Sequence, residues 1–295
     1  MAWWQLSVQC NSDELERTED SMLALGAVSI MLSDAEDEPI YEPLPGDMPV
    51  WQHSIVTGMF DQSYQLEALY DKLLQLLPDH QVATAQKSIL EEQDWERVHL
   101  QHFKPIRCAK NLWIVPSWLQ PPEPTAVNIQ LDPGLAFGTG SHPTTALCLA
   151  WMADKNFNKQ SVIDYGCGSG ILSIAACKLG ASQVFGVDID PQAVEASIEN
   201  ARRNGVDSDS LKITLASNFS SEKVDLLIAN ILSGPLVELS QRFSEMIKPG
   251  GKILLSGILK KQVNDIKCAY QTWFDLEPER TREDWVSVSG IRNNE

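Results

Sequence analysis

Three glycines follow a carboxylate in a segment that could hold a small ligand. Residues 164–170 have the sequence Asp-Tyr-Gly-Cys-Gly-Ser-Gly and stand between an apolar run, Ser161–Asp164, and a helical pattern, Ile171–Leu179. Glycines at such a junction let a ligand approach both the backbone and the amino terminus of the helix. Another acidic residue, Asp188, comes at the end of the next apolar run. The pattern predicts a binding site for a small molecule.

Two classes of ligand fit a glycine loop of this kind. A dinucleotide fingerprint requires Gly-x-Gly-x-x-Gly, whereas here the third glycine, Gly170, comes one residue early. Asp164 would oppose a pyrophosphate, but it would suit S-adenosylmethionine, which has no phosphate and carries positive charges on its sulfonium and amino groups. We assign the ribose hydroxyls to Asp188, and the cap of the following helix to Asp190 with Pro191 in the first turn. The sequence therefore favours S-adenosylmethionine over a dinucleotide.

Two further segments place polar groups next to apolar runs. Asn230 directly follows the apolar run Val224–Ala229, so it is expected at the carboxyl edge of a sheet, where open α/β sheets bind ligands. An Asn at such a place can also serve only as a turn former. The segment 131–145 is rich in glycine and proline, which predicts a shaped loop that can act as a gate. Ser141 or Thr144 is expected to cap the helix that follows this loop.

The elements that position these residues alternate between strand and helix. Such alternation predicts a parallel sheet covered by helices on both faces. An antiparallel hairpin, with a charged turn at 280–284, is expected to close the sheet at one side. The expected strands are Ser161–Asp164, Gln183–Val187, Leu211–Leu215, Val224–Ala229, Lys252–Gly257, Phe274–Glu279 and Trp285–Ile291, and the expected helices are Ile171–Leu179, Pro191–Asn204, Leu236–Met246 and Lys261–Trp273.

The first part of the chain has the order β-α-β-β-α-β, which matches a split βαβ, ferredoxin-like α+β domain. We expect residues 1–90 to form this domain, 91–125 to be a linker with a short helix near Asp94–Phe103, and 126–295 to be the catalytic domain. The expected strands are Trp3–Gln9, Ala27–Leu32, Trp51–Phe60 and Gln81–Leu90, with helices from Asn11 or Ser12 to Leu25 and over Tyr64–Leu77.

The composition is typical of a globular protein, since 43% of the 295 residues are hydrophobic and 21% are charged. A chain of this length allows about two domains. No apolar run approaches the ~20 residues of a membrane-spanning helix, and the start lacks a secretory signal, so we expect a cytoplasmic protein without membrane contact. The six scattered cysteines form no Cys-x-x-Cys pair, which predicts reduced thiols and no metal site.

The net charge of −17 is unevenly distributed along the chain. Residues 1–100 hold 19 acidic and four basic residues, a balance of −15, whereas residues 101–295 hold 21 acidic and 19 basic residues, a balance of −2. An acidic first part repels nucleic-acid phosphates and attracts basic partners, although it can also serve solubility alone. We therefore expect a basic protein partner and no direct contact with nucleic acid.

Four motifs taken together resemble those of one family, the bacterial ribosomal protein L-eleven methyltransferases (PrmA family). The motifs are Asp-x-Gly-Cys-Gly-Ser-Gly, Gly-Val-Asp-Ile-Asp-Pro, Asn-Ile-Leu-x-x-Pro-Leu and Asp-Pro-Gly-x-Ala-Phe-Gly-Thr-Gly. The first two are shared by class I S-adenosylmethionine-dependent methyltransferases, and the last two are narrower. The resemblance covers nearly the whole chain. It implies an α/β fold with a Rossmann-like class I methyltransferase sheet, preceded by a small α+β substrate-recognition domain.

The resemblance also implies a reaction and its participants. The enzyme would transfer methyl groups from S-adenosylmethionine to the N-terminal α-amine and to lysine ε-amines of ribosomal protein L-eleven, up to trimethylated products. We also expect a monomer, since nothing in the sequence indicates a larger assembly. One ordinary class I feature is missing, an Asp in the loop after the third strand, where this chain has Ala-Ser-Asn at 216–218, so adenine contacts there are in doubt. Together with the assignments above, the candidate catalytic residues are Asn230 and His142, and the candidate cofactor-binding residues are Thr145, Gly166, Asp188, Asn230, Asp164, Gly168 and Phe137.

Two alternatives stay open from the sequence. Another class I methyltransferase could act on a protein glutamine or a nucleic-acid base, but such enzymes typically carry Asn-Pro-Pro-Tyr where this chain has Asn-Ile-Leu-Ser at 230–233. The absence of an aromatic residue there fits an aliphatic amine better. A non-catalytic protein that senses S-adenosylmethionine or binds a basic partner could carry the same cofactor motifs.

Overall fold

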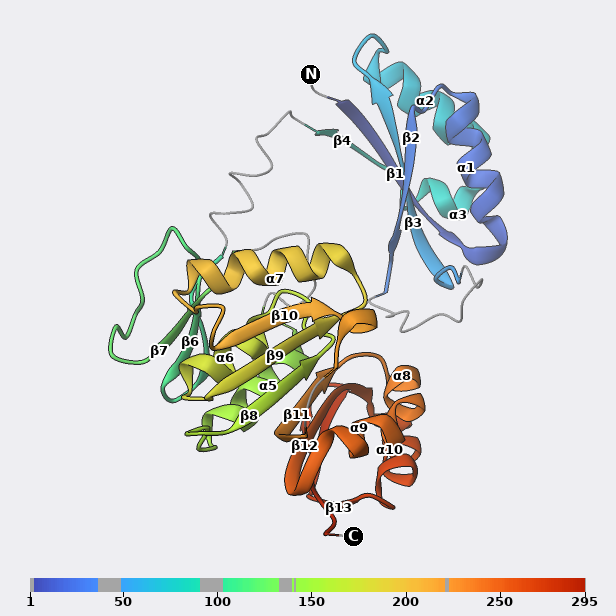
Figure 1. Ribbon diagram of the computed structural model, residues 1–295. Helices are drawn as coiled ribbons and strands as arrows, with labels where there is room; N and C mark the ends of the chain where they lie inside the picture. Colours follow the sequence, from blue (N-terminus) through green and yellow to red (C-terminus); the bar gives the residue numbers. More distant parts are fainter. Residues whose placement is uncertain are drawn as a thin grey trace. The chain divides into compact units, whose positions relative to one another are not determined.

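The structure, a computed structural model, describes residues 3–36, 49–90, 103–132, 140, 142–220 and 223–294. The chain divides into two compact units, Met1–His99 and Leu100–Glu295 (Figure 1). The helix predicted near Asp94–Phe103 falls outside the described residues except for Phe103 itself. None of the helices in the described part of the chain has the length and apolar character needed to cross a bilayer.

The first unit is built on a four-stranded sheet with the order β2-β3-β1-β4. All neighbouring strands in this sheet are antiparallel. β1 and β2 therefore run in the same direction with β3 between them, which confirms the predicted split βαβ arrangement. The elements are β1 (Trp3–Asn11), α1 (Leu15–Ala24), β2 (Ser29–Asp34), β3 (His53–Asp61), α2 (Leu66–Leu76), α3 (Asp79–Val82) and β4 (Gln86–Leu90).

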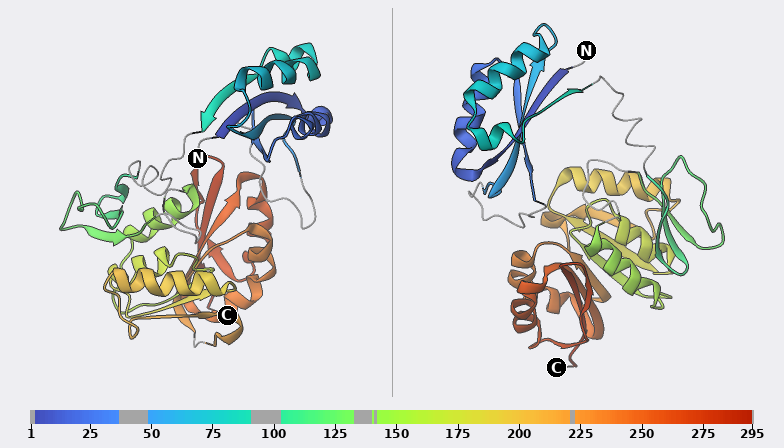
Figure 2. Two further views of the ribbon diagram at one scale, coloured as in Figure 1. Left: turned by 90° about the horizontal axis from the view of Figure 1, so that it is seen from above. Right: turned by 180° about the vertical axis from the view of Figure 1, so that it is seen from behind.

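The helices of this unit lie against one face of its sheet (Figures 1 and 2). Alternate residues of the strands face the helices, as the period of two of a strand requires. The helix α1 ends before Gly26, whose φ of +97° suits glycine and allows the chain to turn into β2. The core of the unit consists of Leu6, Val8, Cys10, Met22, Val56, Phe60, Leu69, Leu73 and Leu77.

The predicted strand Gln81–Leu90 is wrong at its beginning. Asp79–Val82 form the short helix α3 instead, and β4 begins only at Gln86. Gln81 is buried, its Nε2 donates to Glu14 Oε2 at 3.2 Å, and its Oε1 accepts from Thr18 Oγ1 at 3.4 Å. These contacts with a segment more than 60 residues away fix the turn, and a local sequence pattern contains no sign of them.

The second unit contains a mixed sheet with the order β10-β9-β8-β11-β12-β15-β13. The strands from β10 to β12 are parallel, and β15 is antiparallel to both β12 and β13. The predicted parallel sheet with an antiparallel addition at one side is therefore confirmed. The strands are β8 (Ser161–Tyr165), β9 (Gln183–Asp188), β10 (Leu211–Leu215), β11 (Val224–Asn230), β12 (Ile247–Leu259), β13 (Phe274–Leu276), β14 (Arg280–Arg282) and β15 (Trp285–Arg292).

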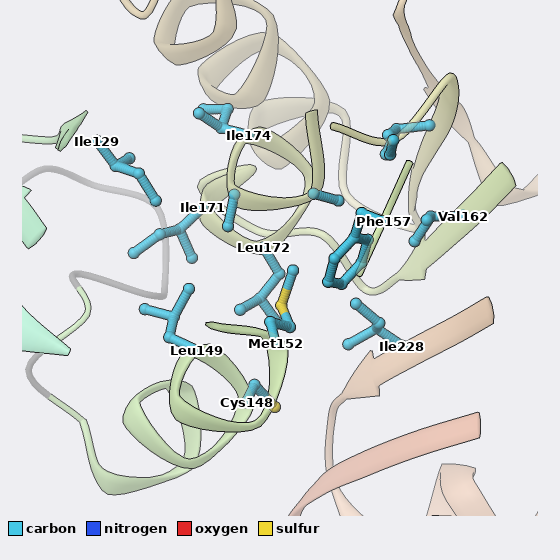
Figure 3. Packing of buried hydrophobic residues seen from close by; sticks show 14 of the residues in the cluster. Ile129, Cys148, Leu149, Met152, Phe157, Val162, Ile171, Leu172, Ile174 and Ile228 are labelled. Carbon is cyan, nitrogen blue, oxygen red and sulfur yellow. The ribbon is translucent and has the colours of Figure 1, made fainter. Parts of the chain in front are cut away.

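Helices pack on both faces of this sheet and create two cores. Along β8, Val162 belongs to one core and Ile163 to the other, because successive side chains of a strand point to opposite faces. Figure 3 shows the first core, in which Phe157 and Met152 are fully buried. The first core holds residues of α5 (Pro143–Ala153), α6 (Ile171–Lys178) and α7 (Pro191–Arg203), and the second holds residues of α8 (Ser233–Glu238), α9 (Ser240–Met246) and α10 (Val263–Tyr270).

A small sheet precedes α5 in the second unit. It consists of β5 (Ile106–Ala109), β6 (Leu112–Val115) and β7 (Val127–Gln130), with β6 parallel to β7. Ile114 and Ile129 belong to the first core. The segment after residue 103 is thus packed onto the second unit rather than extended between the two units.

Two local predictions in this unit are wrong. The single helix predicted over Leu236–Met246 is two short helices, α8 and α9, that meet at Leu239. At this break the buried Tyr270 Oη donates to the backbone oxygen of Leu236 at 2.7 Å, a tertiary bond to a helical carbonyl. The predicted turn at 280–284 contains the short strand β14, which pairs with β15 through a tight turn at Glu283, where φ is +56°.

Candidate functional site

A cavity of about 630 Å³ lies at the edge where the parallel strands of the second unit end. Its volume is that of a typical small-molecule site, about 300–1,000 Å³. Open α/β sheets bind ligands at this edge because the loops after the strands meet there. The lining residues are His142, Thr144, Thr145, Tyr165, Gly166, Cys167, Gly168, Ile171, Leu172, Asp188, Ile189, Asn230, Ile231, Leu232, Pro235, Glu238, Leu239, Gly257 and Trp285.

The glycine loop between β8 and α6 forms one wall of the cavity. Gly166, Gly168 and Gly170 have φ values of +80°, +55° and +78°, which side chains rarely tolerate. A Cβ on Gly166 would stand 2.2 Å from Cγ2 of Ile231, so a side chain there would clash. The loop is tied to the next strand because the Gly166 N–H donates to the Val187 oxygen at 2.7 Å. The loop therefore requires glycine at Gly166, and Gly166 and Gly168 line the cavity.

Asp188 lies at the end of β9 and lines the cavity beside this loop. Its Oδ2 accepts from the Gly168 N–H at 2.9 Å, and its Oδ1 accepts from the Asp190 N–H at 3.0 Å. Each carboxylate oxygen has a second lone pair that can accept a ligand hydroxyl. Asp190 caps α7 as predicted, because its Oδ1 accepts from the Gln192 N–H at 2.9 Å.

Asp164 lies behind the glycine loop and does not belong to the cavity lining. It is 1% exposed, and its Oδ2 accepts from the Ser173 N–H at 2.9 Å and from Ser173 Oγ at 2.7 Å. Its Oδ1 has no hydrogen-bond partner within the described residues. Burial raises the pKa of Asp164 to about 6. The carboxyl group therefore fixes the first turn of α6 from inside the protein.

The opposite wall is formed by residues of α5 and β11. Asn230 Nδ2 donates to Thr145 Oγ1 at 3.3 Å, and Thr145 is fully buried. The Asn230 side-chain oxygen is thereby available as an acceptor. The amino end of α5 is fixed to the sheet because Ser256 Oγ donates to the Thr144 oxygen at 3.1 Å. The structure thus brings together Thr145, Gly166, Asp188 and Asn230 around one cavity.

His142 is the residue that caps α5, rather than Thr144, and Ser141 falls outside the described residues. The His142 Nδ1 accepts from the Thr144 N–H at 3.4 Å. Burial lowers the pKa of His142, so its ring is neutral at neutral pH. Phe137, the other candidate from this segment, also falls outside the described residues.

Sequence reasoning missed two prominent lining residues. Trp285 begins β15, and its ring contacts that of His142 edge-on with centroids 5.0 Å apart. Ile189 is 82% exposed, an unusual exposure for an isoleucine, and stands between two aspartates at the end of β9. The signal for Trp285 was present, because an antiparallel strand beside β12 must begin at the edge where the parallel strands end.

The Asp and Glu side chains in the cavity lining are not balanced by Lys or Arg side chains among the described residues. Among the described residues that line the cavity, Asp188 and Glu238 are acidic, and none is a lysine or an arginine. Most of the other lining residues are apolar. Such a site favours a small ligand with positive charge and disfavours a phosphate.

Comparison with known proteins gives one family for the entire chain. The family "Ribosomal protein L11 methyltransferase (PrmA)" matches residues 2–293. A relative of the same name from Cellvibrio japonicus is 47% identical over 296 residues, covering 99% of this chain and 99% of the relative. A relative of that name from Azotobacter vinelandii is 45% identical, covering 99% of this chain and 100% of the relative.

A solved structure agrees with these relatives. The crystal structure of ribosomal protein L11 methylase from Lactobacillus delbrueckii subsp. bulgaricus aligns with a TM-score of 0.59 and 33% identity, over 65% of this chain and 100% of that chain. This likeness supports the predicted fold class. The chain therefore belongs to the ribosomal protein L11 methyltransferase (PrmA) family, whose members are S-adenosylmethionine-dependent methyltransferases.

Proposed function

We propose that this enzyme methylates amines of ribosomal protein L11, namely the N-terminal α-amine and lysine ε-amines, up to trimethylated products. The name shared by the relatives supports the protein substrate. The observation that supports an amine is the lining of the cavity, which contains Asp188 and Glu238 but, among the described residues, no lysine or arginine. An amine substrate is cationic in water, so it is attracted to such a site.

The residues present fit the cofactor. S-adenosylmethionine supplies a methyl group on a positively charged sulfonium. In the proposed site Asp188 accepts hydrogen bonds from the ribose hydroxyls, while Gly166 and Gly168 allow close approach to the backbone. Thr145 positions the Asn230 side chain through the hydrogen bond between them. Asp164 acts from behind the loop, because its carboxyl group fixes the turn that carries Ser173.

Transfer requires a neutral acceptor nitrogen. A free lysine has a pKa of about 10.4, so the ammonium must lose a proton before its lone pair can attack. An apolar surrounding favours the neutral form, and Ile231, Leu232 and Leu239 supply such a surrounding in the cavity. Asn230 Oδ1 can accept a hydrogen bond from the amine and aim its lone pair, at about 3–3.5 Å from the methyl carbon. His142, neutral at neutral pH, is the second catalytic candidate, as a proton acceptor.

We assign recognition of the substrate protein to the first unit. Its residues carry a balance of −15, and acidic side chains such as Glu16 and Asp20 of α1 are exposed. Ribosomal proteins are generally basic, so long-range attraction steers the substrate to this unit. The same charge disfavours binding to ribosomal RNA.

Mass spectrometry of purified ribosomal protein L11 after incubation with the enzyme and isotopically labelled S-adenosylmethionine tests this function. The expected result is label on the α-amine and on lysine side chains, with mono-, di- and trimethylated species appearing in succession. Label on glutamine side chains, or no label at all, would contradict the proposal.

A further inference from the structure

We propose that Trp285 is the specificity-determining wall of the acceptor pocket, and that its indole binds the methylated ammonium groups formed there. This inference rests on the proposed function and deepens it. Trp285 lines the cavity, but none of the sequence motifs contains it. Its role would be to let one amine pass through successive methyl transfers.

The order of the strands separates a donor side from an acceptor side of the cavity. Along the sheet, the lining residues follow the order Asp188 on β9, Gly166 after β8, Asn230 on β11, Gly257 on β12 and Trp285 on β15. Neighbouring strands lie about 4.8 Å apart. With the ribose at Asp188 and the amide of Asn230 beside the transferred methyl, the space above β12 and β15, about 10 Å wide, is left for the acceptor.

A bulge in β12 lies at this side of the cavity, where Gly257 is a lining residue. The pairing of β12 with β15 shifts between Leu255 and Ile258, and bulges of this kind commonly redirect side chains next to active sites. Gly257 lies in the bulge with φ of +85°, and a Cβ there would stand 2.2 Å from the Ile231 oxygen. The chain after β11 can therefore pass close to β12 only because this residue is glycine.

The position of Trp285 is fixed from both sides. Its backbone pairs with Leu259 of β12 and with Arg282 of β14. The turn before it is anchored because the Lys260 N–H donates to the Asp284 oxygen at 3.0 Å. Its ring meets His142 edge-on. The backbone of Trp285 is thus held by two strands, and its indole has the ring of His142 as a neighbour.

The chemistry of repeated methylation explains why an aromatic wall is needed. In each transfer the nitrogen lone pair forms the new C–N bond while the C–S bond breaks, and that electron pair remains on sulfur in a neutral thioether. The nitrogen becomes a cation and releases a proton to solvent before the next transfer. After the third transfer it has no N–H left to donate. An aromatic face can bind every one of these cations, whereas hydrogen-bond acceptors alone cannot hold the last.

Direct binding of two peptides to the full-length enzyme tests the proposal. One peptide carries trimethyllysine, and the other carries a neutral tert-butyl isostere of the same shape. Wild-type enzyme is expected to prefer the trimethyllysine peptide. Trp285→Leu should weaken the binding of the trimethyllysine peptide about 3- to 30-fold and should change the affinity for the isostere peptide much less. The affinity of Trp285→Phe for the trimethyllysine peptide should lie between those of the wild type and Trp285→Leu. The product ratio on ribosomal protein L11 should shift towards mono- and dimethylated forms.

The matched control is Trp118→Leu, which removes a 40% exposed tryptophan of the same unit that does not line the cavity. It should behave as wild type. The proposal would be overturned if Trp285→Leu weakened the binding of both peptides equally, or if it weakened the binding of S-adenosylmethionine. It would also be overturned if Trp285→Phe kept the wild-type preference for the trimethyllysine peptide over the isostere. If Trp285→Leu fails to fold, the peptide preference of Trp285→Phe alone tests the proposal. Because binding is measured without turnover, absence of transfer to ribosomal protein L11 would contradict only the proposed function.

Discussion

The two units of this enzyme arrange their strands in opposite ways, and this difference parallels the division between chemistry and recognition that we propose. In the second unit five parallel strands end at one edge, so residues that follow different strands, such as Asp188 and Asn230, meet around one cavity. In the first unit neighbouring strands are antiparallel, so residues that follow two neighbouring strands of the sheet lie at opposite edges. A parallel sheet gathers reactive groups, whereas the antiparallel unit displays its charge over its surface.

The two units also differ in net charge. The first unit has a balance of −15 and the second a balance of −2. Exposed acids of the first unit include Glu16 and Asp20 on α1 and Asp71 on α2. In the second unit the important acids are partly or fully buried next to the glycine loop. Surface charge steers a protein partner, whereas an enclosed carboxylate fixes a ligand or a turn.

The largest expected effect concerns the cavity of the second unit. Asp188→Asn should weaken S-adenosylmethionine binding about 10- to 100-fold, because both carboxylate oxygens accept backbone N–H groups and an amide supplies only one acceptor. Isothermal titration calorimetry measures this loss. Affinity for ribosomal protein L11 should stay unchanged, since its recognition is assigned to the first unit.

The control for this variant is Asp190→Asn, two residues away. Asparagine caps helices about as well as aspartate, so α7 and the cofactor affinity should be preserved. If both variants lost cofactor affinity equally, the ribose assignment to Asp188 would be wrong. If Asp188→Asn also lost affinity for ribosomal protein L11, the division of labour between the units would fail.

The second prediction concerns pH. The folded pKa of Asp164, about 6, lies above its ordinary 3.8, so the folded state binds this proton more tightly. The contribution of Asp164 to stability is therefore largest at low pH and decreases as pH rises from about 4 to about 6, by up to tenfold in the folding equilibrium constant per pH unit. Asp164→Asn should remove this dependence. Hydrogen exchange of β8 at a series of pH values measures it.

Glu14 in the first unit provides the contrast. The pKa of Glu14 is lowered, chiefly by the hydrogen bond with His80. Glu14 therefore contributes to the stability of the folded state above its ordinary pKa of 4.5, and this contribution is lost as the pH falls. Exchange in α1 should therefore become faster on acidification, and Glu14→Gln should abolish that response while leaving β8 unaffected. A common pH response of both units would contradict the separation.

The smallest expected effect concerns the electrostatic attraction of ribosomal protein L11 by the acidic residues of the first unit. Neutralising Glu16, Asp20 and Asp71 together, as Gln or Asn, should slow association with ribosomal protein L11 about 3- to 10-fold at low ionic strength, with less effect at high salt. Stopped-flow measurements at several salt concentrations determine the rate. S-adenosylmethionine affinity should not change.

A matched triple variant in the second unit serves as the control. Neutralising the exposed Glu195, Asp209 and Asp265 changes the net charge equally. If this variant slowed association as much as the first, overall charge rather than the first unit would steer the substrate. If neither variant had an effect, the acidic balance of the first unit would serve solubility alone.

Local patterns predicted the elements that depend on local physics. The glycine loop, the cap at Asp190 and the strand order of the first unit follow from backbone preferences and from hydrophobic periodicity. The predictions failed where a distant side chain decides the outcome. Tyr270 donates to a carbonyl of α8 close to the break in the helix expected over Leu236–Met246. Gln81 lies in the short helix α3 and binds Glu14 and Thr18.

The sequence by itself determined the cofactor class and the fold, because residue types in short segments limit what the backbone and a ligand can do. Only the tertiary structure decided which of those residues share a cavity. It set Asp164 behind the loop and brought Trp285, more than 50 residues after Asn230, to the same edge. The reason is that burial and proximity arise from packing of whole elements, which no short stretch of sequence encodes.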